Sequence, residues 1–251
     1  MKNYSQISLK LTEFLASYLE KSGAKGFVLG VSGGLDSAVV AALCARTGFE
    51  THALLMPTKY SNERNLSDAL KLCEDLKITH KIIEIQPILD SFTAQIGEPL
   101  SNLRIGNLSA RARMCLLYDY SAKVNALVVG TSNKSERLLG YGTIYGDMAC
   151  ALNPIGELFK TEIYELAKEL GIDEKIIVKA PSADLWEGQS DEADIGYSYE
   201  RLDEVLRLAQ SKGEAELASE FDPRLVATVF SRMRANKFKL SLPPIASLDG
   251  E

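Results

Sequence analysis

The sequence is poor in the residues that many catalytic and metal-binding sites use. It has four cysteines and two histidines in 251 residues, and the nearest two cysteines, Cys44 and Cys73, lie 29 positions apart. Without a CxxC pair the chain lacks the ligand spacing of structural zinc and iron–sulfur sites, and its scattered cysteines are not typical of a disulfide framework. His52 and His80 fall in apolar runs typical of strands, and no hydrolase motif surrounds them. These absences argue against metal clusters and against Ser-His-Asp or Cys-His hydrolases.

The sequence also lacks long apolar runs and an excess of basic charge. No run approaches the roughly 18 apolar residues that a membrane helix needs, and the first 20 residues alternate apolar with polar side chains instead of forming a signal peptide. The 28 basic and 34 acidic residues give a net charge of −6, which argues against a broad surface for nucleic acid. We therefore expect a cytoplasmic protein that binds neither membranes nor nucleic acid.

Four short apolar runs, rich in β-branched residues, alternate with helical patterns along the first half of the chain. The runs cover residues 26–31, 51–56, 80–85 and 126–130, and the helical patterns cover residues 7–19, 37–47, 63–76 and 108–124. This alternation is typical of a doubly wound α/β fold, with a buried parallel sheet flanked by helices. A length of 251 residues favours a single domain over residues 1–251. In such folds ligands bind beyond the carboxyl ends of the strands, so we expect the site there.

The second half of the chain lacks this regular alternation of apolar runs and helical patterns. A glycine- and serine-rich stretch at residues 130–160 is too long for an ordinary connection, which indicates a functional loop, and a helical pattern returns at residues 163–170. Residues 182–200 hold six acidic residues and no basic one, with Trp186 among them, and we interpret this segment as a mobile lid. Residues 231–240 carry four basic residues and no acidic one, which makes a small basic patch near the end.

The strongest functional signal is the octet GVSGGLDS, residues 30–37, which lies between an expected strand and an expected helix. Adjacent glycines let backbone N–H groups approach a ligand, two serines add hydroxyl donors, and the following helix directs its positive end at the same point. This pattern predicts a polyphosphate site that differs from both GxxxxGK[ST] and GxGxxG. Asp36 would repel phosphate unless a cation lies between them, so the octet also predicts Mg²⁺. The alternative is a structural turn in which Asp36 only caps the helix.

The octet resembles the pyrophosphatase loop of the N-type ATP pyrophosphatases, which split ATP into AMP and pyrophosphate while adenylating an oxygen of their substrate. Other segments resemble, in order and spacing, the ammonia-dependent NAD synthetases of that superfamily: NLSARARM at 107–114, GTSNKSE at 130–136, YGD at 145–147 and KAPSAD at 179–184. The resemblance covers nearly the whole chain. It implies a sheet of about five strands in an adenine nucleotide alpha hydrolase-like fold, and a homodimer. It also implies the reaction, which is ATP-dependent amidation of deamido-NAD by ammonia through an adenylated carboxylate.

The same resemblance implies roles for the residues at matching positions. Asp36, Glu136 and Lys160 are the implied catalytic residues, and the carboxylates of Asp36 and Glu136 would hold Mg²⁺. The residues implied to bind ATP are Gly30, Val31, Ser32, Gly33, Gly34, Leu35, Asp36, Ser37, Thr131, Lys160 and Ser182. Those implied to bind deamido-NAD are Arg111, Asp147, Asn236 and Lys237. Arg113, which lies on the same expected helix as Arg111, is left open for the same task.

The match is weakest on the nicotinate side of the substrate. Ile144 and Ala151 stand where other family members carry lysine and aspartate, and Asn236 and Lys237 stand in place of a histidine–lysine pair. Because only 25 residues precede the first expected strand, we expect no amidase domain, and free ammonia or ammonia passed from another chain as the nitrogen donor. Two other interpretations of the loop are a tRNA-modifying ligase, which the net charge and the lack of paired cysteines disfavour, and a nucleotide-binding sensor without activity.

Overall fold

A parallel sheet forms the centre of the molecule. The structure is a computed structural model that describes residues 2–182 and 188–246, and within them four strands pair in the order β3-β2-β1-β4. The strands are β1 (Gly26–Gly30), β2 (Glu50–Leu55), β3 (Thr79–Ile82) and β4 (Ala126–Val128), and every pairing is parallel. The prediction of a doubly wound α/β fold is confirmed.

The described sheet has one strand fewer than expected, but a further segment runs beside β4. Val129 forms an isolated parallel bridge with Leu152, flanked by hydrogen bonds from Ala151 N to Val128 O at 2.8 Å and from Gly130 N to Leu152 O at 2.9 Å. The chain therefore leaves the sheet after Gly130 and returns to it at Leu152. The glycine-rich stretch is an excursion from the carboxyl edge of the sheet, anchored at both ends.

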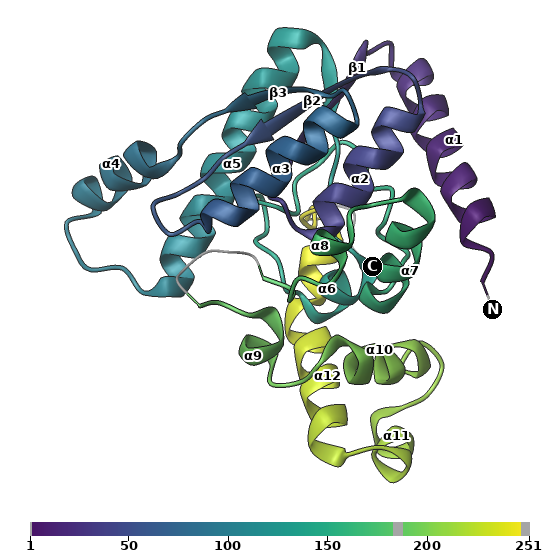
Figure 1. The fold of residues 1–251 in the computed structure, drawn as a ribbon. Helices are drawn as coiled ribbons and strands as arrows, with labels where there is room; N and C mark the ends of the chain where they lie inside the picture. The colour runs from purple at the N-terminus through teal and green to yellow at the C-terminus, as the bar shows by residue number, and fades with distance from the viewer. Residues whose placement is uncertain (1, 183–187, 247–251) are drawn as a thin grey trace.

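Helices cover both faces of the sheet, because neighbouring strand residues point to opposite sides. Phe27 and Leu29 pack on one side with α1 (Tyr4–Ser22), α2 (Leu35–Arg46), α3 (Glu63–Asp75), α7 (Lys160–Leu170) and α8 (Glu174–Ile177). Val28 packs on the other side with α4 (Gln86–Ile96) and α5 (Asn102–Val124). Figure 1 shows α2 and α3 in front of the strands and α5 behind them.

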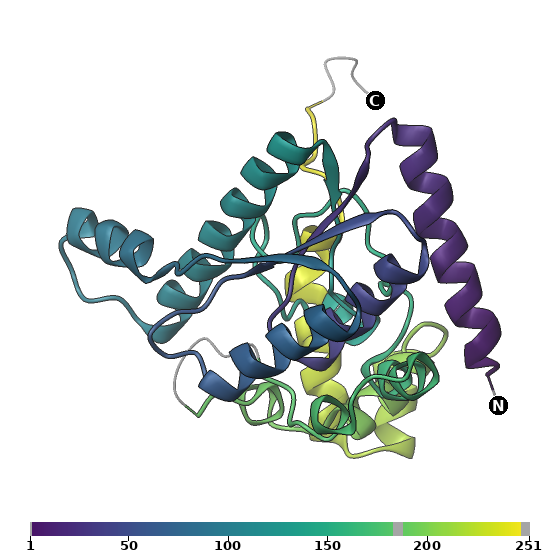
Figure 2. The same cartoon turned by 45° about the horizontal axis from the view of Figure 1, so that its top comes forward.

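A second apolar core lies outside the sheet. It joins Leu139 of α6 (Lys134–Leu139) and Phe159 to apolar residues of α9 (Asp191–Ile195), α10 (Tyr199–Leu208), α11 (Glu214–Glu220) and α12 (Pro223–Asn236). A short 3₁₀ helix, η1 (Lys237–Leu240), follows α12. Figures 1 and 2 both show α9 to α12 gathered below the sheet, with α12 rising from this group toward the loops at its edge. The C-terminal helices thus form a wall next to those loops.

The expected helices and strands are present, with shifted ends. β3 is shorter than the predicted run at 80–85, and its four residues are exposed because it is the edge strand. Helix α4, with Pro87 in its first turn, was not predicted, and neither were α6, which lies within the stretch expected to be a loop, α8 to α12 and η1. Among the described residues, no helix is both long and apolar enough to cross a membrane.

Candidate active site

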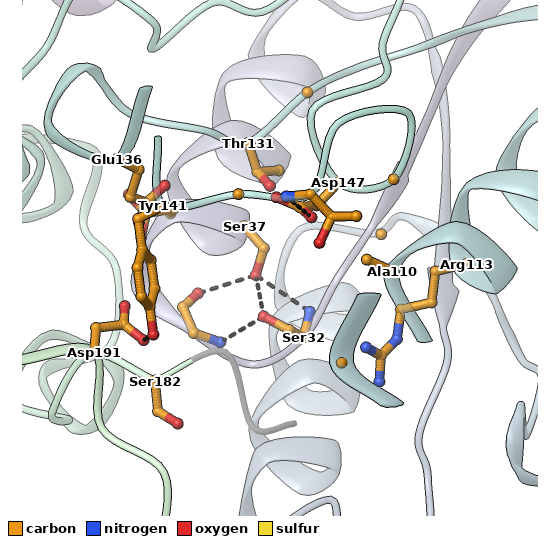
Figure 3. A pocket seen from close by; sticks show the side chains of 18 of the residues that line it. Ser32, Ser37, Ala110, Arg113, Thr131, Glu136, Tyr141, Asp147, Ser182 and Asp191 are labelled. Atoms are coloured by element: carbon orange, nitrogen blue, oxygen red, sulfur yellow. Dashed lines mark hydrogen bonds between the residues drawn. The ribbon is translucent and has the colours of Figure 1, made fainter. Parts of the chain in front are cut away.

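The loop between β1 and α2 is held in a tight curve by two serine side chains. Ser37 Oγ donates a hydrogen bond to Gly34 O at 3.0 Å and accepts one from Ser32 N at 3.2 Å, while Gly34 N donates to Ser32 Oγ at 3.3 Å. Figure 3 shows this network at the wall of the cavity. The two hydroxyl groups therefore shape the loop as well as facing the space where a ligand would lie.

Asp36 does not cap helix α2. The N-cap residue is Gly34, which makes no side-chain cap, and Asp36 lies within the first helical turn. Its Oδ1 accepts a hydrogen bond from Asn133 Nδ2 at 3.0 Å, so the carboxylate contacts the N-cap residue of α6. The helix presents its N-terminal end at the cavity without a side-chain cap, as an anion site requires. The interpretation of the octet as a simple capped turn is wrong.

Gly33 has a backbone conformation and an environment that only glycine suits. Its φ is +80°, and a Cβ built there would lie 2.1 Å from Asn65 O and 2.8 Å from Asn65 C. Both are backbone atoms of α3, which cannot move aside as a side chain tip can. The close approach of loop and helix fixes the position of the loop over the sheet edge.

A cavity of about 770 Å³ opens at the carboxyl ends of β1, β2 and β4. This is where a doubly wound fold binds its ligands. Of the residues predicted to bind ATP, all but Gly33 line the cavity, and the predicted metal ligand Glu136 lines it as well. The volume is within the range of cofactor sites in enzymes.

Three charged side chains from distant parts of the chain meet at the floor of this cavity. Lys160 Nζ forms a very short contact with Asp36 Oδ2 and lies 3.6 Å from Glu136 Oε1. Lys160 is only 3% exposed. The structure therefore brings together the three residues predicted to be catalytic, with the lysine placed between the two carboxylates.

The electrostatics of this group favour an additional cation. Burial and the nearby charge of Asp36 raise the pKa of Glu136 to about 8, although Lys160 opposes the shift. Burial disfavours the charge on Lys160, but Asp36 and Glu136 outweigh it and raise the pKa of the lysine above its usual value. One lysine thus neutralises two carboxylates incompletely. A cation next to Glu136 would favour its ionised form.

Asn133 is a central residue that sequence reasoning missed. It is fully buried, its Oδ1 accepts from Glu136 N at 3.0 Å, and Glu136 Oε2 accepts from Asn133 N at 3.3 Å. This is a capping box at the start of α6, and the same asparagine also donates to Asp36. The NKSE spacing in the sequence is a recognisable capping signal. Asn133 therefore orients both carboxylates.

Lys179 ties the start of the acidic segment to the loop. Its Nζ donates to Gly33 O at 2.9 Å and to Asn65 Oδ1 at 2.8 Å, and forms an ion pair with Asp68 at 2.6 Å. Lys179 begins the KAPSAD segment that carries part of the family resemblance, but sequence reasoning gave this lysine no role. In the folded chain it lines the cavity and connects α3, the loop and the segment that follows α8.

The cavity wall also holds some of the residues predicted to bind deamido-NAD. Asp147 and Asn236 line it, whereas Arg111 and Lys237 are not among the lining residues. Arg111 Nη2 instead donates to Ile144 O at 3.4 Å. Arg113, left open from the sequence, lines the cavity, and its Nε donates to Met56 O at 3.0 Å. Figure 3 shows Arg113 on the side of the cavity opposite Glu136.

The C-terminal segment presents two basic residues to the cavity, Arg232 and Lys239. Lys239 Nζ donates to Gly140 O at 2.8 Å and Gly142 O at 2.9 Å. Burial lowers the pKa of this lysine, an effect that the nearby Asp147 opposes. The family resemblance named Lys237, two positions earlier, because Asn236 and Lys237 stand where other members carry a histidine–lysine pair.

The described part of the acidic segment is folded against the cavity. Gln189, Asp191 and Asp194 line it, and Asp191 is 4% exposed. Tyr141 Oη donates to Asp194 Oδ2 at 2.8 Å and lies 3.2 Å from Asp191 Oδ1, a contact that is visible in Figure 3. The segment contains α9 and the first residues of α10. Trp186 lies outside the described residues.

Fold and site together define a class of protein. A loop of the SGGxDS type lies between a parallel strand and an uncapped helix, faces a nucleotide-sized cavity and has two carboxylates beside it. This is the arrangement expected of an ATP-cleaving α/β enzyme of the ATP pyrophosphatase kind.

The sequence model of the family described as NAD synthase matches residues 7–243, and the chain belongs to this family. The predicted family membership is confirmed. An NH(3)-dependent NAD(+) synthetase of Campylobacter jejuni is 54% identical over 98% of this chain and 100% of the relative. A protein of the same description from Helicobacter pylori is 50% identical over 98% of this chain and 97% of the relative.

Solved structures agree with the family assignment. The NH3-dependent NAD synthetase from Campylobacter jejuni in complex with the nitrate ion superposes with a TM-score of 0.85, at 47% identity over 98% of this chain and 100% of that chain. The NMN synthetase from Francisella tularensis superposes with a TM-score of 0.91, at 34% identity over 99% of this chain and 100% of that chain. The fold and its size are therefore those of these enzymes.

Proposed function

We propose that this protein is an AMP-forming carbon–nitrogen ligase that amidates deamido-NAD with ammonia and so produces NAD. The observation that carries the proposal is the meeting of Asp36, Glu136 and Lys160 beside the loop at residues 30–37, on the floor of a nucleotide-sized cavity. The ammonia-dependent relatives, which align along their whole length, support the same reaction.

In the proposed reaction ATP activates a carboxylate that ammonia cannot attack directly. A carboxylate oxygen of the nicotinate forms a bond to the α-phosphorus of ATP, and the bond from that phosphorus to the bridging oxygen breaks, which releases pyrophosphate. Ammonia then attacks the acyl carbon of the mixed anhydride, AMP leaves, and the nitrogen loses a proton. The protein contributes positioning and charge neutralisation, since no step needs a covalent bond to the enzyme.

The loop and the lysine would hold the phosphates of ATP. Backbone N–H groups of residues 33–37 lie at the N-terminal end of α2, where an anion is favoured. Thr131 and Ser182 line the same cavity and supply hydroxyl groups. Lys160 Nζ lies between two carboxylates, and it would also interact with the phosphates once they bind. These residues together account for the proposed ATP site.

Mg²⁺ fits the residues present. Asp36 and Glu136 are oxygen donors of the kind that Mg²⁺ prefers. Burial and Asp36 raise the pKa of Glu136 to about 8, and a bound cation would stabilise its ionised form. No described cluster of three or more His, Cys, Asp or Glu side chains forms a complete metal cage, so phosphate oxygens would supply further ligands. Bound there, the ion would offset the negative charge of the triphosphate.

The dinucleotide would contact Asp147, Asn236 and Arg113, all of which line the cavity. The sequence assigned this task to Arg111, Asp147, Asn236 and Lys237, and two of them, Asp147 and Asn236, line the cavity. We add Arg113 and Lys239, because their charged groups lie at the cavity wall. A planar guanidinium and an ammonium group suit the phosphates of a dinucleotide.

The acidic segment at 182–200 is proposed to close over bound nucleotide and to keep water from the adenylate. Bound Mg²⁺ would offset the negative charges of Asp191 and Asp194, which line the cavity, and so hold the segment in place. We expect Glu-C protease to cleave at Glu192 and Glu200 in the free protein, and to cleave them more slowly when ATP and Mg²⁺ are both present. Mass mapping measures the two rates. Glu84 serves as the internal control, since it is exposed, lies between β3 and α4 outside the cavity lining, and is followed by a cleavable Glu84–Ile85 bond. Equal cleavage of Glu192 and Glu200 with and without ligand would remove the support for a lid.

We also propose a cytoplasmic homodimer. Apolar side chains on and beside α4 and α5, among them Phe92, Leu103 and Tyr118, are exposed in the single chain, as expected for a face that meets a second copy. A monomer mass in sedimentation would contradict the dimer, and recovery of the protein in membrane fractions would contradict the location.

Purified protein tests the reaction itself. With ATP, Mg²⁺, deamido-NAD and ammonium we expect NAD, AMP and pyrophosphate in equal amounts, and with glutamine in place of ammonium we expect almost none. Nicotinic acid mononucleotide belongs in the same assay as a second acyl substrate, because one structural relative is named an NMN synthetase. Equal rates with glutamine would contradict the ammonia dependence. Faster turnover of the mononucleotide would contradict the choice of dinucleotide, and ATP binding without pyrophosphate release would favour the sensor.

A further inference from the structure

We propose that Asp203, on α10, is a positioning residue that sets the distance between Lys160 and Glu136. The proposal rests on the proposed function, because the enzymatic rate is its main readout. Asp203 belongs to the C-terminal helical group and does not line the cavity. It acts through the two residues that it binds.

Asp203 is a buried carboxylate that accepts hydrogen bonds from α6 and α7, the helices that carry Glu136 and Lys160. It is 1% exposed. Its Oδ2 accepts hydrogen bonds from Thr161 N at 2.9 Å and from Thr161 Oγ1 at 2.8 Å, and its Oδ1 accepts a very short one from Ser135 Oγ. One carboxylate therefore joins α10 to the N-terminal ends of both α6 and α7.

Each of the bound residues is the chain neighbour of a catalytic residue. Ser135 precedes Glu136, and Thr161 follows Lys160. A further bond closes the network, since Lys160 N donates to Ser135 Oγ at 2.8 Å. The backbones that carry the catalytic carboxylate and the catalytic lysine are thus locked together through Ser135 and Asp203, independently of the contact between their side chains.

Helix α10 also contacts the side chain of Lys160. The ring of Tyr199 lies one turn before Asp203 on α10, with its centroid 5.5 Å from Lys160 Nζ. A cation near the face of a tyrosine ring is attracted to it. Helix α10 therefore holds Lys160 at its backbone through Asp203 and at its charged end through Tyr199. Two contacts from one helix, at both ends of one side chain, favour a role in positioning over a general role in packing.

The chemistry of the network requires a carboxylate. Thr161 N, Thr161 Oγ1 and Ser135 Oγ all donate to Asp203, and an ionised carboxyl group accepts three such bonds near the N-terminus of α7. In Asp203→Asn one oxygen becomes an NH₂ group that faces Ser135 Oγ. Ser135 would then have to turn its own hydrogen elsewhere, and its acceptor geometry toward Lys160 N would change.

The test compares Asp203→Asn with a matched buried acid in the first turn of α7, Glu162. Glu162 is 4% exposed, accepts from Phe159 N at 2.9 Å and pairs with Arg207 at 2.9 Å and Lys2 at 2.7 Å, away from the cavity. Glu162→Gln removes a buried charge from the same helix end. We expect both variants to lower Tm, but only Asp203→Asn to lower kcat, by about 10- to 100-fold, as is typical for residues that orient ligands.

Further measurements separate positioning from loss of structure. Misplacement of Lys160 against Glu136 should lower kcat and raise the Mg²⁺ concentration for half-maximal rate, and it should also raise KM for ATP, because Lys160 is proposed to hold the phosphates; Glu162→Gln should change none of the three. In a double-mutant cycle the effects of Ser135→Ala and Asp203→Asn on kcat should be non-additive, since both substitutions break one network.

If Asp203→Asn does not fold, Thr161→Val and Ser135→Ala each remove one hydrogen bond to Asp203 and should lower kcat and raise the Mg²⁺ requirement in the same direction. Unchanged kcat in folded Asp203→Asn, or equal kcat losses in Asp203→Asn and Glu162→Gln, would overturn the proposal. Absence of NAD synthesis by the unmodified protein would instead overturn the proposed function.

Discussion

The variants Asp36→Asn and Glu136→Gln are each expected to lower kcat for NAD formation by at least about 10²-fold, the scale on which preorganised charge acts in enzymes. Both substitutions keep the shape of the side chain and remove one negative charge from the proposed Mg²⁺ site. Lys160 would then face a single carboxylate, and the cation that offsets the triphosphate would lose a ligand. Steady-state kinetics at several Mg²⁺ concentrations measure the effect.

The fold should survive either change, because the remaining contacts are sufficient. In Asp36→Asn the amide oxygen can still accept from Asn133, and Glu136 still neutralises Lys160 at 3.6 Å. The matched control is Asp75→Asn, which removes a carboxylate from the exposed side of α3, where it pairs with Lys71. Circular dichroism checks that all three variants are folded. Full activity of Asp36→Asn at ordinary Mg²⁺ would contradict the metal assignment.

Gly33→Ala is expected to reduce kcat/KM for ATP by about 10²-fold or more, because displacement of a binding loop by roughly 1 Å has effects of that size. A methyl group would lie 2.1 Å from Asn65 O, and a positive φ of 80° is unfavourable for alanine in any surroundings. The loop must therefore move away from α3. Its movement would break the bond from Lys179 to Gly33 O and misalign the N–H groups that face the phosphates.

A second glycine separates the two causes. Gly48 has a φ of 78°, but nothing lies within 4 Å of the Cβ that would be added. Gly48→Ala should therefore lose about 1 kcal/mol of stability from backbone strain alone and keep its affinity for ATP. Isothermal titration with a nonhydrolysable ATP analogue and thermal unfolding measure both quantities. If Gly33→Ala binds the analogue as tightly as Gly48→Ala does, the loop is not the phosphate site.

The sheet and the helices around it were predictable because their signals are local. Each strand is a short apolar run, and each adjoining helix has an apolar stripe, so periodicity alone places them. Helix α4 was missed because Ile85, the end of the expected third strand, is followed at once by Gln86, the first residue of the helix, so no loop separates strand from helix. Helices α9 to α12 were missed because their apolar residues form a second core outside the sheet, so the alternation of strands and helices does not mark them.

The candidate site was predictable in its residue types but not in its geometry. The octet and the capping signal at Asn133 are local patterns, and the family resemblance supplied Glu136 and Lys160. The placement of Lys160 between two carboxylates, and the choice of Lys239 over Lys237 and Arg113 over Arg111 at the cavity wall, depend on packing between distant helices. Asp203 carries no local signal at all, since its partners lie 68 and 42 positions away in the chain.

The long separations within the site also govern when it forms during synthesis. The bond between Asp36 and Lys160 spans 124 positions, and the bonds from Lys239 to Gly140 and Gly142 span 99 and 97. A growing chain exposes the loop at 30–37 long before its lysine and its C-terminal wall have left the ribosome, and non-local contacts form only when both partners are present. A growing chain from which Lys160 and Lys239 have not yet emerged therefore carries the loop at 30–37 without the contacts that complete the proposed site.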